Sequence, residues 1–196
     1  MGDDTATKAM LRRYLQTPRE ALIWKLEGLS EREARTPRTP TGTSLLGLVK
    51  HCLAVEIGYF GETMGRPWPT PAETPWEDAD DPLADMWATP DESVASLTDL
   101  YRRVWVFADE TIDALPLDAV GHVPWWPAER SEVTLGQVMV HVTADIARHA
   151  GHADILREQI DGAVGLRVDN TNIPGMTADD WAAYVARLQQ VADDAR

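Results

Sequence analysis

The sequence predicts an all-α protein built as an up-down four-helix bundle with an additional C-terminal helix. Proline- and glycine-rich connections separate the helical segments, and no segment has the alternating pattern of a convincing strand. The 196 residues are most simply one domain, with a bundle core over about 4–162 and a C-terminal loop and helix over 163–196. Apolar residues recur at three- and four-residue steps near residues 4–28, 44–63, 90–115 and 134–161.

The first helical segment carries one apolar stripe along its whole length, although Pro18 interrupts it. Thr17, Pro18 and Glu20 have the form of a capping box with proline at the first helical position. The segment is therefore either a kinked helix or two pieces ending at Gly28, and the shared stripe favours the kink. Residues 30–43 then form a connection, because prolines and a glycine stand among threonines and charged residues.

The second helix fits residues 44–63, with Lys50 outside its buried stripe. His51 belongs to that stripe, because it is spaced three and four residues from apolar neighbours. A lone histidine on an apolar face is more often a hydrogen-bonded core residue than a metal ligand, so its role depends on the other helices. Cys52 points about 100° away from His51 on a helix, which favours a buried structural thiol over a Cys/His nucleophile.

Residues 64–89 are the longest irregular segment, with five prolines, three tryptophans and a run of acids. Loops longer than about 12–15 residues in compact domains are usually functional or disordered. The tryptophans favour packing over disorder, so we expect this segment to form one wall of a pocket. A capping box from Thr89 to Glu92 then predicts the start of the third helix, which runs to about Leu115.

Residues 116–133 are predicted to be a turn region, in which His122 is a solvated loop histidine. Trp125 and Trp126 belong either to the core or to a pocket wall. The fourth helix follows and ends at Gly162, because glycine supplies the left-handed cap. A further capping pattern predicts a fifth helix that docks on the bundle through Trp181, Tyr184, Val185 and Leu188.

The fourth helix carries the strongest functional signal in the chain. At about 100° per residue, four polar side chains fall within an arc of roughly 80° on the apolar side of this helix. Burying such groups without partners costs at least about 1–3 kcal/mol each, and a divalent metal would satisfy several of them at once. One helix cannot close such a site, so a further ligand must come from elsewhere. The four side chains are His141, Asp145, His149 and His152.

Three imidazole and carboxylate ligands with an open coordination position describe a catalytic divalent site better than a closed structural one. Such an ion lowers the pKa of a bound water or thiol. Zn²⁺ suits the ligand set, with Ni²⁺ next, and Fe²⁺ and Mn²⁺ are compatible with it. The alternative is that the histidines only form hydrogen bonds in a polar core.

Arg148 and Arg157 flank the histidine strip and are candidates for binding a cofactor or a substrate carboxylate. Arginines near a metal site are nonetheless usually surface charges or ion-pair partners. Asp154 and Glu158 are expected to form a solvated face.

Composition excludes several classes of function. A formal charge of −14 and a pI near 4.6 oppose binding to nucleic acid or to an anionic membrane. The chain has neither a secretory signal pattern nor an apolar run of about 18 residues. Its lone cysteine, Cys52, forms no intrachain disulfide. We therefore expect a soluble, cytoplasmic protein.

The sequences HCLAVE at 51–56 and DIARHAGHADILRE at 145–158 resemble the DinB-like superfamily of metal-binding four-helix bundles, and an actinobacterial branch of it most closely. The resemblance covers roughly residues 5–162. In that superfamily one histidine on the second helix and two residues four apart on the fourth hold a divalent ion, which implies His51, Asp145 and His149 here. Asp145 departs from the family's His or Glu, and its shorter side chain leaves His152 as the alternative third ligand.

The resemblance to mycothiol-dependent maleylpyruvate isomerases and thiol S-transferases implies a function. The protein would be a divalent-metal-dependent transferase or isomerase that directs a low-molecular-weight thiol such as mycothiol at a small electrophile. Two alternatives stay open, a metal-dependent hydrolase of a small amide or ester and a non-catalytic helical binding module. The expected partners are a small-molecule substrate and a thiol, and a homodimer is left open.

Overall fold

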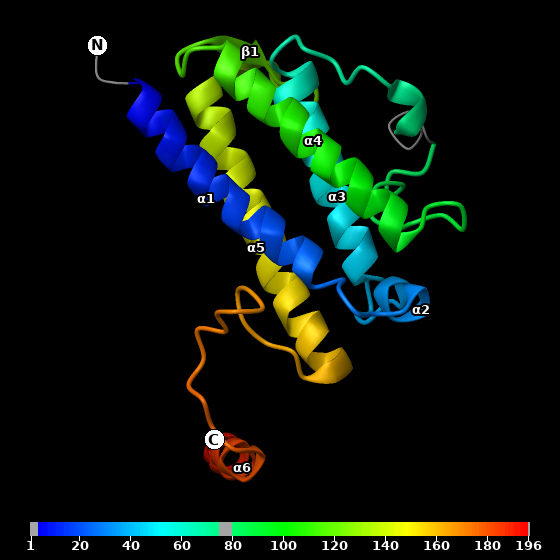
Figure 1. Cartoon of the computed structure of the whole chain (residues 1–196), viewed down its shortest axis with the longest axis vertical. Coiled ribbons are helices and arrows are strands. Elements are labelled where there is room, and N and C mark those ends of the chain that lie inside the picture. The colour runs from blue at the N-terminus through cyan, green and yellow to red at the C-terminus, as the bar shows by residue number, and fades with distance from the viewer. Residues whose placement is uncertain (1–3, 75–79, 196) are drawn as a thin grey trace.

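Four long helices form the body of the protein in the computed structural model, which describes residues 4–74 and 80–195. Figure 1 shows α1 lying along α5 and α3 lying along α4. This arrangement confirms the all-α class and the bundle predicted from the sequence. The four helices are α1 (Asp4–Trp24), α3 (Leu45–Glu56), α4 (Val94–Ala114) and α5 (Leu135–Asp161).

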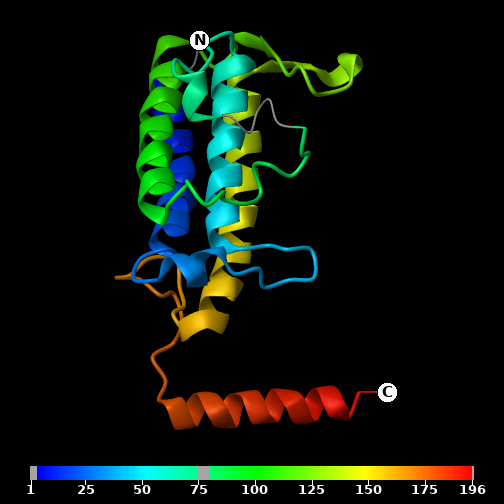
Figure 2. The ribbon, with the colours of Figure 1, turned by 90° about the vertical axis from the view of Figure 1, so that its right-hand side faces the viewer.

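The helices α3 and α4 run in the same direction, since both end at the same end of the bundle (Figure 2). At the starting end, the Nζ atom of Lys50 lies 2.9 Å from the carboxylate of Glu92, just before α4. At the other end, the amide of His122 donates a 2.9 Å hydrogen bond to the carbonyl of Thr63. The order of helix directions therefore differs from a simple up-down alternation, and it is of the type with a long crossover.

The first helix continues through Pro18 to Trp24, and a turn then ends at Gly28 with φ of 77°. The expected connection over 30–43 contains one short helix, α2 (Glu31–Arg35), which begins with a capping box between Ser30 and Glu33.

The third predicted helix, α4, begins at Val94 rather than near residue 90. The side chain of Ser93 is its cap. The carboxylate of Glu92 instead accepts hydrogen bonds from the amide of Thr89 and from Lys50. The capping box predicted from Thr89 to Glu92 therefore lies in the turn before the helix. Lys50 is buried, contrary to our expectation, because this ion pair satisfies its charge.

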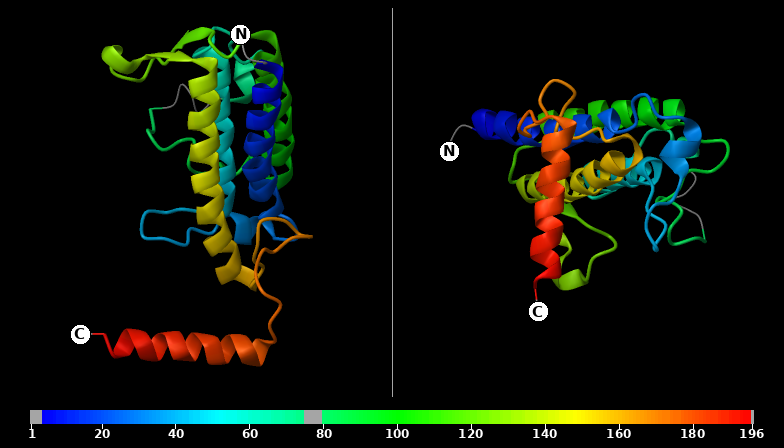
Figure 3. Two further views of the ribbon diagram at one scale, coloured as in Figure 1. Left: turned by 90° about the vertical axis from the view of Figure 1, so that its left-hand side faces the viewer. Right: turned by 90° about the horizontal axis from the view of Figure 1, so that it is seen from below.

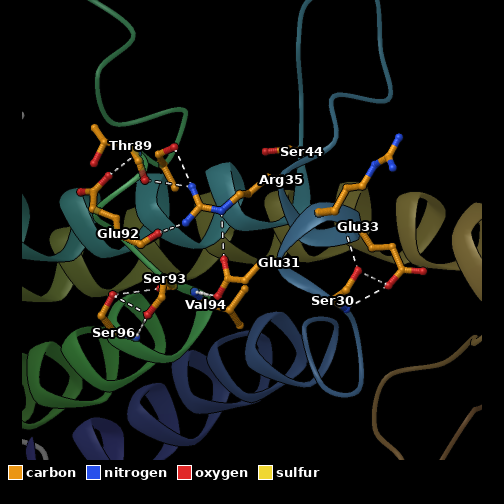
Figure 4. Close-up of polar contacts among 12 residues, drawn as sticks. Ser30, Glu31, Glu33, Arg35, Ser44, Thr89, Glu92, Ser93, Val94 and Ser96 are labelled. Atoms are coloured by element: carbon orange, nitrogen blue, oxygen red, sulfur yellow. Dashed lines mark hydrogen bonds and ion pairs between the residues drawn. The ribbon is translucent and has the colours of Figure 1, made fainter.

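A polar cluster joins α2 to the start of α4 (Figure 4). The guanidinium of Arg35 donates to the carbonyls of Ala88 and Thr89 at 3.0 and 2.9 Å. The carboxylate of Glu31 accepts a 2.7 Å hydrogen bond from the amide of Val94. These contacts fix the end of the crossover segment, residues 63–93, against the N-terminal half of the chain.

The end of α3 passes directly into a π-helical turn, η1 (Ile57–Glu62), so the predicted second helix extends over both elements. The predicted turn region over 116–133 contains a small antiparallel pair, β1 (Val120–His122) and β2 (Glu132–Thr134). His122 is exposed there, as expected. Two short 3-10 turns, η2 (Pro71–Glu73) and η4 (Ala128–Arg130), complete the connections.

The C-terminal helix α6 (Ala178–Asp193) lies away from the bundle (Figure 3). The prediction that its apolar side docks on the bundle is wrong, since none of its residues is buried. The physical reason is that the long helices already bury one another's apolar stripes, while residues 163–177 carry the chain past the end of α5. None of the described helices is long and apolar enough to cross a membrane. The apolar residues left on the surface of α6 include Tyr184, Val185, Leu188 and Val191.

Candidate metal centre

Two neighbouring helices bring together His51, Asp145 and His149. His51 lies on α3, while Asp145 and His149 lie one turn apart on the facing side of α5. One ligand atom from each residue lies within 4.8 Å of the other two. All three side chains are only partly buried, so the group lies at the edge of the core with access to solvent. These are the three residues that the family resemblance implied, and the alternative third ligand, His152, is not in the group.

A carboxylate from the crossover segment supports His51. The Nδ1 atom of His51 lies 2.7 Å from Oδ2 of Asp85, and the hydrogen bond from His51 lowers the pKa of Asp85. This contact leaves Nε2 of His51 available to a metal. Sequence reasoning did not single out Asp85. The only signal was the run of acids in a segment that we expected to line a pocket.

The surroundings of His149 favour the neutral form of its imidazole ring. Its ring packs edge-on against that of His51 with centroids 4.7 Å apart, and its Nε2 lies 3.7 Å from Oδ2 of Asp145. Burial lowers the pKa of His149, and the nearby His51 lowers it further, while Asp145 acts in the opposite direction. Histidine must be neutral to bind a metal, so this environment favours the binding form.

These residues fit a divalent ion. The set of two imidazoles and one carboxylate is typical of catalytic zinc sites. The Nδ1 atom of His149 is buried and has no hydrogen-bond partner among the described residues, so a ring nitrogen of this residue is free to offer its lone pair to a metal ion. Metal-bound histidines usually donate their other ring N–H to a carboxylate or carbonyl, and His51 does so to Asp85.

The two other histidines of the strip are exposed, contrary to our expectation that all four polar groups face inward. His152 lies next to His149 with ring centroids 5.5 Å apart, but it is outside the group whose ligand atoms converge. His141 lies one turn before Asp145 and packs against Tyr59 with ring centroids 4.8 Å apart. The arc therefore crosses the boundary between core and solvent, and only its middle is partly buried.

A cleft of about 700 Å³ opens beside the converging group, and His51 and Asp145 line it. The π-helical turn η1 presents Tyr59, which packs edge-on against Trp125 with centroids 5.1 Å apart. Gly58 makes room for that indole, because a Cβ there would lie 2.9 Å from it. The crossover segment supplies Asp81 and Asp85 to the lining. This confirms for the described residues that the segment forms a pocket wall; Trp76, also expected there, lies outside them.

The two arginines proposed as cofactor contacts have different surroundings. Arg157 is buried, and its guanidinium contacts Asp161 at 2.8 Å and the carbonyls of Lys25 and Glu27 at 2.9 Å. These contacts join α5 to the end of α1, so Arg157 stabilises the fold and does not reach the cleft. Arg148 is exposed, and its positive charge contributes to the lowered pKa of His149.

A four-helix bundle with a His/Asp/His group between two facing helices has the architecture of bundles whose candidate metal sites lie on facing helices. The chain belongs to the mycothiol-S-transferase family, whose model matches residues 10–162, within the DinB-like superfamily. It is also similar in fold to a conserved protein from Enterococcus faecalis, known from a crystal structure. The TM-score is 0.63 at 17% identity, over 79% of this chain and 97% of that one. A search of the curated proteins gives no match.

Proposed function

We propose that the protein is a divalent-metal-dependent transferase or isomerase that directs the sulfur of a low-molecular-weight thiol such as mycothiol at a small electrophile. Membership of the mycothiol-S-transferase family supports the thiol. The metal is supported by one observation, the convergence of three ligand atoms within 4.8 Å of one another at the edge of an open cleft. A closed structural site would have no such opening.

His51, Asp145 and His149 are the proposed ligands, and Zn²⁺ or Ni²⁺ is the proposed ion. A bound ion would supply Lewis acidity that favours the thiolate form of a thiol at neutral pH. The protein's own part is to hold two imidazoles and one carboxylate in place before the thiol arrives. Packing against His51 holds the ring of His149, and the hydrogen bond to Asp85 holds that of His51.

Away from the proposed ion, the cleft lining favours an uncharged or cationic electrophile over an anionic one. Its lining includes the carboxylates of Glu62 and Asp81 and the aromatic faces of Tyr59 and Trp125, and no lysine or arginine among the described residues. Carboxylates would repel a negatively charged substrate, whereas aromatic faces attract cations. A substrate carboxylate bound by Arg148 would have to lie outside this lining.

Metal analysis of protein purified without a histidine tag tests the centre. We expect one equivalent of divalent metal in the wild type and little in His51→Ala or His149→Ala. His122→Ala, which removes an exposed histidine of the β1 strand, is the matched control and should keep its metal. Absence of metal from wild-type protein after repletion would leave a helical binding module as the better hypothesis.

Cobalt substitution tests the thiol. Direct ligation of Co²⁺ by the sulfur of mycothiol should add a charge-transfer band in the near ultraviolet, and the His149→Ala variant should not show it. If thiols give no band while small amides or esters turn over, the protein is a metal-dependent hydrolase and the transferase proposal is wrong.

A further inference from the structure

The first two turns of α3 hold one short stretch of the crossover segment at three points. A Cβ at Gly47 would lie 2.0 Å from the carbonyl oxygen of Met86, so only glycine admits the backbone at this distance. The Nζ atom of Lys50 donates a 3.0 Å hydrogen bond to the carbonyl of Trp87. Asp85, the residue directly before Met86, contacts His51 through its side chain. The backbone on the C-terminal side of Asp85 is therefore fixed against the helix that carries His51.

The contact between Asp85 and His51 has only one possible direction. A carboxylate at neutral pH accepts hydrogen bonds and cannot donate them. The Nδ1 atom of His51 must therefore carry the proton in the 2.7 Å contact. In a neutral imidazole the other nitrogen, Nε2, then has the lone pair. Without this contact the ring could take either tautomer and rotate about its side-chain bonds.

We propose that Asp85 is a positioning residue that holds His51 in the Nδ1–H tautomer, and that Gly47 seats the backbone from which Asp85 reaches it. This proposal rests on the proposed metal centre. It explains how His51, a ligand on α3, is oriented by a residue 34 positions away in the chain. Carboxylates in this position both orient an imidazole and raise its basicity as a ligand. Asp85 itself need not touch the metal or the substrate.

The tautomer can be measured in protein without metal. Long-range ¹H–¹⁵N spectra should show His51 protonated at Nδ1 in the wild type and no longer held in that form in Asp85→Ala. Asp80→Asn, which changes an exposed carboxylate in the same segment, is the matched control and should leave the spectrum of His51 unchanged. A wild-type His51 protonated at Nε2 would overturn the proposal.

Metal affinity gives the second measurement, by competition with a chromophoric chelator. We expect Asp85→Ala to bind Zn²⁺ about 10–100-fold more weakly, the usual effect of removing such a support, and Asp80→Asn to bind it as the wild type does. Gly47→Ala should weaken binding as Asp85→Ala does, although it touches neither ligand. Unchanged affinity in Asp85→Ala would refute the positioning role. A wild type that takes up no metal would refute the proposed function, and the tautomer spectra would still decide about Asp85.

Discussion

The guanidinium of Arg19 and the carboxylate of Glu56 form an ion pair in the centre of the bundle, with Nε of Arg19 donating to Oε1 of Glu56 at 2.9 Å. Both side chains are fully buried. The hydroxyl of Tyr101 donates to the same carboxylate oxygen at 2.9 Å. The three residues come from α1, α4 and the last residue of α3, so the pair connects three helices directly before the π-helical turn that lines the cleft.

Removing one partner of this pair should strongly destabilise the protein. Glu56→Ala leaves the Arg19 charge buried, with the partly exposed Asp109 as its remaining ion-pair partner among the described residues. Breaking a buried pair in this way typically costs about 3–5 kcal/mol, which urea denaturation would measure as a lower free energy of unfolding. Glu110→Ala, an exposed glutamate on α4, is the control and should change stability by less than about 0.5 kcal/mol. A similar small loss in Glu56→Ala would contradict the role of the pair.

Tyr101 should make stability fall at alkaline pH. Burial raises the pKa of its phenol well above the ordinary value, and the charge of Glu56 raises it further. Because the folded pKa is the higher one, this residue's contribution is complete below the unfolded value of about 10 and is lost as the pH rises above it. The difference in unfolding free energy between wild type and Tyr101→Phe should therefore shrink above about pH 10. A difference that stays constant from pH 8 to 11 would speak against this.

The identity of the third ligand can be decided by a pair of variants. Asp145→Asn keeps the shape of the side chain but removes the negative charge, so we expect metal affinity to fall at least about 10-fold. His152→Ala should bind metal as the wild type does, because His152 lies outside the converging group. Chelator competition on both variants would show this, and the opposite order would assign the third position to His152.

Deleting residues 175–196 should leave the bundle and its metal centre intact. Helix α6 has no buried residues, so its loss removes helical signal in circular dichroism without removing core contacts. We expect the Tm to change by less than about 2–4 °C, or less than about 1 kcal/mol. Sedimentation of both chains would also show whether the exposed apolar side of α6 mediates the homodimer that the sequence left open. A large drop in Tm for the monomeric bundle would mean that α6 stabilises it.

The local features of this protein follow from its sequence alone. Apolar spacing identified the four long helices, and the cap residues Thr134 and Gly162 gave both ends of α5. Helical geometry also determined that Asp145 and His149 lie on one face, since residues four apart are neighbours on any α-helix. Even the pairing of that face with His51 came from sequence, through the resemblance that the family match confirms.

Contacts between residues distant in the chain became known from the three-dimensional structure, and they show which buried polar groups have partners. The burial of Lys50 depends on Glu92, and the support of His51 depends on Asp85, because a long crossover segment passes along α3. Helical periodicity contains no information about where such a segment lies. The same limit explains α6, whose apolar stripe predicted docking but lies at the end of a linker that carries it past the bundle. Amphipathic spacing shows that a face can be buried, whereas burial itself requires a partner within reach.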